Sequence, residues 1–278
     1  MKRIDGLRDI ADQFDLFLVD QYGVLHDGVA AYPGAIDGLA RIASSERKVI
    51  VLTNSGKNAA DNLIRLEKLG FIDSNFQVVS SGEVGLQLVR GGALGPRYTI
   101  GAAACVIGRS DDRYAFSSDD FDLVDRPLDA AFLVFAGSDA PRTSLQSYRV
   151  ILKTAAEAGV PAICVNPDIT MIREGQLVPA PGAIAKVYED LGGQVEYVGK
   201  PHGALFRHAL AVAAAGVDAR ALMIGDSPEH DVSGGRAIGL STLLVRTGVH
   251  QSLAEPQLLS LCTACRGTPD FLTAAFKW

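Results

Sequence analysis

Charged and polar side chains in this sequence recur where short apolar runs end. Four such places comprise Asp20 after Leu16–Val19, Thr53 and Asn54 after Val49–Leu52, Lys200 after Val195–Val198, and Asp226 with Asp231 after Ala221–Ile224. Alone, each has a simpler interpretation, as a helix cap or a solvated surface lysine. Ligands of open α/β sheets bind at the carboxyl ends of strands. The recurrence therefore predicts one site that contains all four signals.

The chemistry of these groups indicates phosphoryl transfer. Carboxylates gathered at one sheet edge repel each other unless a cation lies among them, and oxygen ligands suit Mg²⁺. Lys200 would hold Asp20 and the phosphoryl oxygens by charge, keeping the carboxylate ionised. Thr53 and Asn54 would hold equatorial oxygens as charge develops. Asp20 would attack phosphorus, and water would then hydrolyse the aspartyl-phosphate.

The elements that must position these residues alternate between buried strands and amphipathic helices, which predicts an α/β protein with a parallel sheet. One predicted helix places Leu63, Ile64, Leu66 and Leu69 toward the core. The pattern changes after a strand and hinge near Val78–Gly82 and resumes after about Pro179. We therefore expect a core formed by residues 1–82 and 180–278, with residues 83–179 as an inserted domain.

Composition narrows the function classes. The chain has 278 residues, 48% of them apolar, and a net charge of −6 without a basic block, which argues against a nucleic-acid surface. No uncharged run approaches the roughly 20 residues that span a bilayer, and the N-terminus has no signal core. Cys262 and Cys265 have the spacing of half a metal or redox site, without a second pair. We expect a cytoplasmic protein.

The order and spacing of the motifs resemble the haloacid dehalogenase superfamily, in particular the class IIA phosphatases that act on nucleotides, 4-nitrophenyl phosphate and pyridoxal phosphate. The resemblance covers nearly the whole chain. The matching motifs are Asp-Gln-Tyr-Gly-Val-Leu at 20–25, Leu-Thr-Asn at 52–54, Asn-Pro-Asp at 166–168, Gly-Lys-Pro at 199–201, Gly-Asp-Ser-Pro-Glu-His-Asp at 225–231 and Arg-Thr-Gly at 246–248.

The resemblance implies a Rossmann-like core with an α/β cap domain inserted between the second and third motifs. It implies Mg²⁺ bound by the side chains of Asp20 and Asp226 and by the backbone carbonyl of Tyr22, with Asp231 supporting the metal. Asn166 and Asp168 of the cap are the candidates to face the substrate, and a turn role for Asn-Pro-Asp is the alternative. The expected partner is a small phosphorylated metabolite, without nucleic acid or membrane, and a homo-oligomer stays open.

Position 22 departs from the pattern of the family. Its phosphatases usually carry there a second aspartate, which protonates the leaving group and later activates water. The Tyr22 phenol, with a reference pKa of about 10, is poorly matched to that task at neutral pH. The sequence predicts a slow phosphatase that acts best on aryl phosphates, unless His26 supplies the missing acid.

Tyrosine at this position also resembles the haloacid dehalogenases proper, which attack carbon and use no metal. Carbon–halogen hydrolysis is therefore the alternative enzymatic function. A third interpretation is a degenerate phosphatase that binds a phosphorylated ligand as a sensor; Tyr22 supports it, while the presence of Asp20, Lys200 and Asp226 argues against it.

Overall fold

The computed structural model describes residues 1–44, 47–72, 75–173, 175–214, 216 and 218–278. Two compact units divide the chain. Unit 1 contains Met1–Thr53, Ala60–Val79 and Lys200–Trp278, and unit 2 contains Asn54–Ala59 and Ser80–Gly199. Among the described residues, no helix combines the length and the apolar character needed to cross a bilayer.

Unit 1 is built on a seven-stranded sheet with the order β1-β14-β13-β12-β2-β3-β4. Its strands are β1 (Lys2–Arg3), β2 (Leu16–Asp20), β3 (Lys48–Thr53), β4 (Gln77–Ser80), β12 (Ala221–Gly225), β13 (Ser241–Val245) and β14 (Phe271–Thr273). The helices of this part are α1 (Ala35–Ala43), α2 (Ala59–Lys68), α6 (Gly203–Val212), α7 (Ser233–Ala237) and α8 (Glu255–Ala264).

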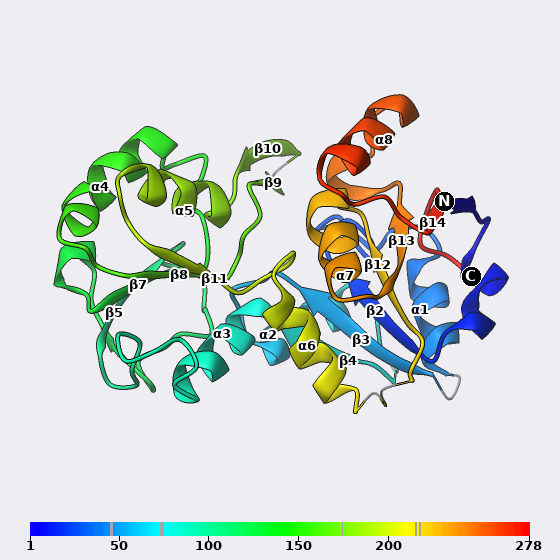
Figure 1. Ribbon diagram of the computed structural model, residues 1–278, viewed down its shortest axis with the longest axis horizontal. Helices are drawn as coiled ribbons and strands as arrows, with labels where there is room; N and C mark the ends of the chain where they lie inside the picture. The colour runs from blue at the N-terminus through cyan, green and yellow to red at the C-terminus, as the bar shows by residue number, and fades with distance from the viewer. Residues whose placement is uncertain (45–46, 73–74, 174, 215, 217) are drawn as a thin grey trace. The chain divides into compact units, whose positions relative to one another are not determined.

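Strand β2 is the centre of this sheet. It pairs in parallel with β3 on one side and β12 on the other, as Figure 1 shows. Its side chains are buried on both faces: Phe17 and Val19 belong to the same hydrophobic cluster as Leu39 of α1, and the neighbouring Leu18 is fully buried. The chain runs outward from β2 to β4 and later returns on the other side, so the carboxyl end of β2 lies at the topological switch point.

Unit 2 contains a second parallel sheet, with the order β11-β8-β7-β5-β6. Its strands are β5 (Ala103–Ile107), β6 (Asp122–Leu123), β7 (Phe132–Phe135), β8 (Ala162–Cys164) and β11 (Val195–Tyr197), and its helices are α3 (Ser81–Arg90), α4 (Leu145–Glu157) and α5 (Pro181–Asp190). A separate antiparallel hairpin joins β9 (Thr170–Arg173) to β10 (Gln176–Pro179). The expected α/β fold with a parallel-sheet core is confirmed.

The segment 180–199, which the sequence pattern placed in the core, groups with unit 2 in the structure. Strand β11 pairs with β8 in register from Val195 opposite Ala162. Helix α5 packs Ile184 and Tyr188 into the cluster of unit 2. The end of the hairpin resembled the end of a domain in the sequence, but the chain completes one more helix and strand before it returns to unit 1.

The predicted inner face of α2 is wrong in part. Leu66 is buried and Leu69 is partly buried, but Leu63 and Ile64 are exposed by 37% and 47%. The buried stripe instead contains Asn62, one helical turn before Leu66. Three apolar residues within four positions cover a wider arc of the helix surface than the single stripe that this short helix buries.

Candidate active site

Three carboxylates converge at the carboxyl edge of the sheet in unit 1. Asp20 is the last residue of β2, Asp226 directly follows β12, and Asp231 lies in the helical turn Pro228–Val232 after it. One carboxylate oxygen from each lies within 4.8 Å of those of the other two, and all three residues are buried. Thr53, the last residue of the neighbouring β3, is also buried at this edge.

Lys200 lies inside this cluster, so the interpretation of it as a solvated surface lysine is excluded. Its side chain is 3% exposed. The ammonium nitrogen lies 2.5 Å from Asp20 Oδ1 and 2.8 Å from Asp231 Oδ1, and it donates to the carbonyl of Leu52 at 3.2 Å. Burial by itself lowers the pKa of Lys200, but the charges of Asp20 and Asp231 outweigh it, so that pKa lies above its usual value.

The charge of the cluster fits a divalent cation. Three carboxylates against the ammonium of Lys200 leave two negative charges in a buried space. The pKa of the Asp226 carboxyl lies well above its usual range, because burial and then the charges of Asp20 and Asp231 disfavour its ionised form. A cation with oxygen ligands, such as Mg²⁺, would remove this penalty. The donor set therefore suits the metal that the sequence predicted.

Glycines make room for the carboxylates, and their role was not singled out in the sequence. At Gly23 and Gly248, which have φ values of +90° and +71°, an added Cβ would meet the Asp226 carboxylate. At Gly225 it would overlap the side chain of Asp231. Thr247 donates from its hydroxyl to the carbonyl of Gly23 at 2.5 Å, and so ties the loop before Gly248 to the turn after β2. The Arg-Thr-Gly motif thus shapes the walls of the cluster.

Replacing Gly248 with alanine tests this packing. We expect Gly248→Ala to lower the free energy of unfolding by about 2–5 kcal/mol, through left-handed strain of about 1–2 kcal/mol and overpacking of about 1–3 kcal/mol. Gly239→Ala is the matched control, because Gly239 has a φ of +83° with open space around it, and only the strain should appear. Urea unfolding without metal measures both. Equal losses in the two variants would contradict the packing role.

Tyr22 lies in the turn after β2, with its ring edge-on to His26 at a centroid distance of 5.7 Å. Burial, followed by the nearby Tyr32, Asp27 and Asp226, raises the pKa of the phenol to about 12. At neutral pH this group neither takes up nor releases a proton readily.

His26 is held as a neutral, structural residue. Its Nδ1 accepts a hydrogen bond from the backbone N–H of Gly28 at 2.9 Å, and its Nε2 lies 3.2 Å from the side-chain nitrogen of Gln21. Burial, together with the charge of Arg65, lowers the pKa of His26 to about 4. A buried imidazole that is neutral at neutral pH and is fixed through Nδ1 argues against His26 as the substitute acid.

The remaining predicted site residues, Asn54, Asn166 and Asp168, belong to unit 2. The sequence analysis expected Asn54 to hold phosphoryl oxygens beside Thr53. In the structure its side-chain amide donates to Asp168 Oδ1 at 2.8 Å. The backbone N–H of Asp168 in turn donates to Asn166 Oδ1 at 3.1 Å. These three residues therefore form one network within unit 2.

Cys262 and Cys265 lie at the end of α8, and both thiols are free. Burial raises the pKa of Cys262 to about 11 and also raises that of Cys265. A protonated thiol is a poor nucleophile and a poor metal ligand at neutral pH. These cysteines are therefore best explained by packing.

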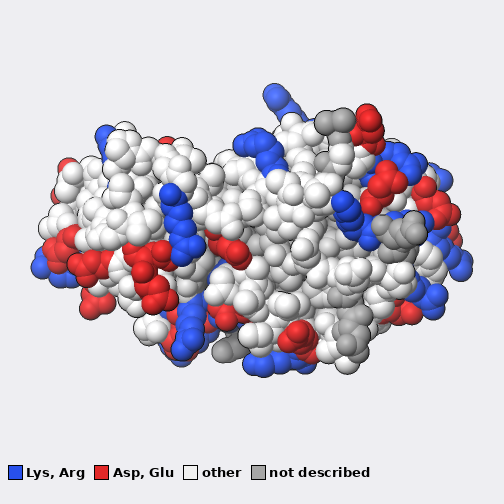
Figure 2. Space-filling model, turned by 90° about the horizontal axis from the view of Figure 1, so that it is seen from below, with Lys and Arg blue, Asp and Glu red and all other residues white. Residues whose placement is uncertain are grey.

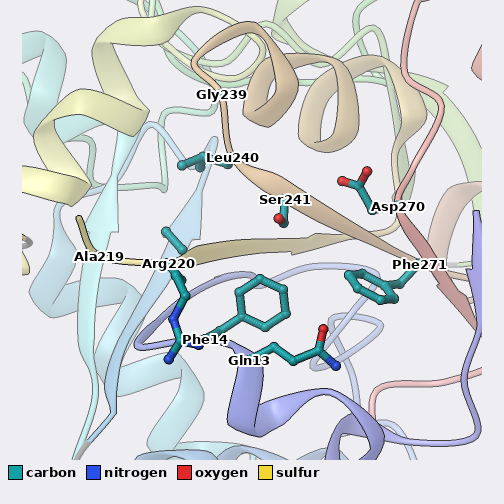
Figure 3. A pocket seen from close by; sticks show the side chains of 10 residues that line it. Gln13, Phe14, Ala219, Arg220, Gly239, Leu240, Ser241, Asp270 and Phe271 are labelled. Carbon is teal, nitrogen blue, oxygen red and sulfur yellow. The ribbon is translucent and has the colours of Figure 1, made fainter. Parts of the chain in front are cut away.

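A cavity of about 470 Å³ lies at the opposite edge of the sheet in unit 1. Ala221, Ser241 and Phe271, the first residues of β12, β13 and β14, line it. Figure 3 shows Phe14 and Phe271 beside this space. The carboxylates lie at the other ends of these strands, so we place the chemistry at the carboxylate cluster.

Comparisons with known proteins agree with this geometry. A family model described as haloacid dehalogenase-like hydrolase matches residues 17–121, and a second, HAD-hydrolase-like model matches residues 197–263. Chronophin from Rattus norvegicus is 30% identical over 270 residues, covering 91% of this chain and 82% of that protein.

Solved structures give the same result. A haloacid dehalogenase-like hydrolase from Brucella suis 1330 superposes with a TM-score of 0.81 at 27% identity, covering 98% of this chain and 99% of its own. Glycerol phosphate phosphatase from Mycobacterium tuberculosis, in complex with magnesium, has a TM-score of 0.65 at 28% identity and covers 86% of this chain and 70% of its own.

Proposed function

The chain belongs to the haloacid dehalogenase-like hydrolases, within the class IIA phosphatases, and from this premise we propose that it is a Mg²⁺-dependent hydrolase of small phosphate monoesters. The observation that carries this proposal is the buried cluster of Asp20, Asp226 and Asp231 around Lys200. A metal-independent dehalogenase has no need for three carboxylates whose mutual repulsion a divalent cation would relieve.

Asp20 is the proposed nucleophile. Its Oδ1 is held by Lys200, which leaves the carboxylate ionised and oriented. Attack on phosphorus breaks the bond to the alcohol or phenol oxygen, which departs as the leaving group, and gives an aspartyl-phosphate. Asp20, Asp226 and the backbone carbonyl of Tyr22 would hold Mg²⁺ with support from Asp231, and the ion would neutralise charge on the phosphoryl group. Lys200 and the hydroxyl of Thr53 stabilise the charge that develops on the equatorial oxygens.

Tyr22 makes the proposed enzyme slow. With a pKa of about 12 the phenol cannot efficiently protonate a leaving group or activate water. Leaving groups that depart without a proton, such as aryl oxides, should therefore be preferred in the first step. Hydrolysis of the aspartyl-phosphate should then limit turnover.

Unit 2 is the proposed cap, in which Asn166 and Asp168 contact the organic part of a small phosphorylated metabolite. This assignment rests on the likeness to the phosphatases and on the position of both residues, which follow the carboxyl end of β8 at one edge of the sheet. On the face shown in Figure 2, acidic and basic side chains are interspersed. This face lacks the continuous basic stripe that would follow a nucleic-acid backbone. Oligomer formation stays a prediction.

Replacing Asp226 with asparagine should separate stability from metal binding. A carboxyl whose pKa is raised on folding contributes stability below its unfolded pKa, and loses it as pH rises through the folded pKa. With chelator present and at a pH above the folded pKa, Asp226→Asn should therefore have a melting temperature about 2–4 °C higher than that of the wild type. This shift corresponds to a gain of about 1 kcal/mol in the free energy of unfolding. Added Mg²⁺ should stabilise only the wild type, more strongly as pH rises. A lower melting temperature of the variant in chelator would contradict this.

The test of the function is turnover of 4-nitrophenyl phosphate with Mg²⁺ and with chelator. We expect metal-dependent release of phosphate. Halide release from 2-chloropropionate that is unaffected by chelator would instead indicate the dehalogenase. No turnover in either assay, with tight binding of a phosphorylated metabolite, would indicate the sensor.

A further inference from the structure

Two of the four points at which the polypeptide passes between the two units adjoin proposed catalytic groups. Asn54, the first residue of unit 2, directly follows Thr53. Gly199, the last residue before the final return to unit 1, directly precedes Lys200. The backbone of Asn54 and Gly199 is therefore bonded to the residues that we assign to the phosphoryl group.

Within unit 2, the side chain of Asn54 and the backbone of Gly199 pack together. A Cβ added at Gly199 would lie 2.6 Å from Asn54 Oδ1 and 3.0 Å from the hydroxyl of Ser81, and would overlap the ring of Pro167. Only a glycine allows this approach. The Asn166–Asp168 loop, defined as residues 166–168 after β8, thus packs against the point where the chain leaves for Lys200.

The loop is also held by hydrogen bonds. The buried Asn54 donates from Nδ2 to Asp168 Oδ1 at 2.8 Å, across 114 positions of sequence. The Asp168 N–H donates to Asn166 Oδ1 at 3.1 Å, and the Asp168 carbonyl accepts from Gly182 at the start of α5 at 2.9 Å. The contact with Asn54 fixes the carboxylate itself, and bonds to ionised acceptors are among the stronger ones in proteins.

We propose that Asn54 is a positioning residue: its amide fixes the Asp168 carboxylate and the Asn166–Asp168 loop relative to the backbone of Asn54 and Gly199, the residues of unit 2 that adjoin Thr53 and Lys200 in the sequence. This differs from the role of phosphate ligand that the sequence predicted for Asn54, and it rests on the proposed phosphatase function. The loop then contacts the organic part of the substrate while it is held in one fixed conformation. Asn54 acts on the substrate only through Asp168.

A double-mutant cycle on the full chain tests the proposal. Asn54→Ala and Asp168→Ala should each raise KM for glycerol 3-phosphate by about tenfold. The double variant should also raise KM by about tenfold, rather than by about a hundredfold, because the effects of coupled residues are not additive. Inhibition by inorganic phosphate, which reports the phosphate-binding end, should stay unchanged in all three. Ser81→Ala is the control: Ser81 adjoins Gly199, its hydroxyl makes no hydrogen bond among the described residues, and the KM of the variant should match the wild type.

Additive effects in the cycle, or weaker phosphate inhibition in Asn54→Ala alone, would overturn the proposal and restore Asn54 as a phosphate ligand. Turnover by the wild type and by Ser81→Ala tests the phosphatase function separately. A readout without turnover is amide hydrogen exchange at Asp168, which should become faster in Asn54→Ala and slow again in the exchanged pair Asn54→Asp with Asp168→Asn. Unchanged exchange in Asn54→Ala would also overturn the proposal.

Discussion

Replacing Tyr22 with aspartate is expected to raise kcat for an alkyl phosphate such as glycerol 3-phosphate by about 10² to 10⁴ in the presence of Mg²⁺. This is the range that a positioned general acid–base contributes. The phenol in the wild type has a pKa of about 12, so it is a much weaker acid toward the leaving alkoxide than a carboxyl and, being protonated at neutral pH, is no base for the attacking water. A carboxyl near Asp20 would protonate that group and then deprotonate the attacking water.

Pre-steady-state kinetics should show that the gain in Tyr22→Asp includes the second step of the reaction, the hydrolysis of the aspartyl-phosphate. With 4-nitrophenyl phosphate, the wild type should release about one equivalent of nitrophenolate rapidly and then turn over slowly, since the leaving group needs no proton whereas hydrolysis needs a base. In Tyr22→Asp the burst should shrink as hydrolysis accelerates.

Tyr22→Asn is the matched control for the change of shape. Both substitutions remove the ring that packs edge-on against His26, and both should cost about 1–3 kcal/mol of stability. Only the aspartate supplies an acid–base group, so Tyr22→Asn should leave kcat near the wild-type value. Equal gains in both variants would mean that Tyr22 obstructs the site, and no gain in either would mean that another residue already supplies the proton.

The fold class and the convergence of the carboxylates were accessible from the sequence, because both depend on local signals. The buried strand Leu16–Val19 is a continuous apolar run in the sequence, and Asp20 directly follows it. Once the strands are parallel and adjacent, the ends of β2 and β12 meet at one edge without further information. Lys200 was expected there because it follows the strand Val195–Val198. The structure pairs it with Asp20 and Asp231, although that strand, β11, belongs to the sheet of unit 2.

Features that depend on distant pairing were not accessible. No local pattern connects Asn54 with Asp168, and the capping and turn tendencies of asparagine and aspartate hide their hydrogen bond. The lowered pKa of His26 depends on its burial and on the charge of Arg65, and no local pattern shows either of them. The end of unit 2 was placed too early, because only the pairing of β11 with β8 assigns that segment.

Replacing Asp20 with asparagine is expected to lower kcat by about 10⁴ to 10⁶, the range seen when a catalytic nucleophile is removed. The carboxamide is nearly isosteric and still offers an oxygen to Lys200, but it is too weak a nucleophile to form the phosphoenzyme. Wild-type protein quenched with acid during turnover should carry phosphate on the peptide that contains Asp20, and Asp20→Asn should carry none.

Asp15→Asn is the control at the other end of the same strand. Asp15 is half-exposed and pairs with Arg220 in unit 1, so its loss should change stability by at most about 1 kcal/mol and leave kcat within about twofold. If Asp20→Asn kept more than a hundredth of the wild-type kcat, or if phosphate were found on another residue, Asp20 would not be the nucleophile. If instead no residue carried phosphate, water at the carboxylate cluster would attack phosphorus directly, and the burst expected for the wild type would be absent as well.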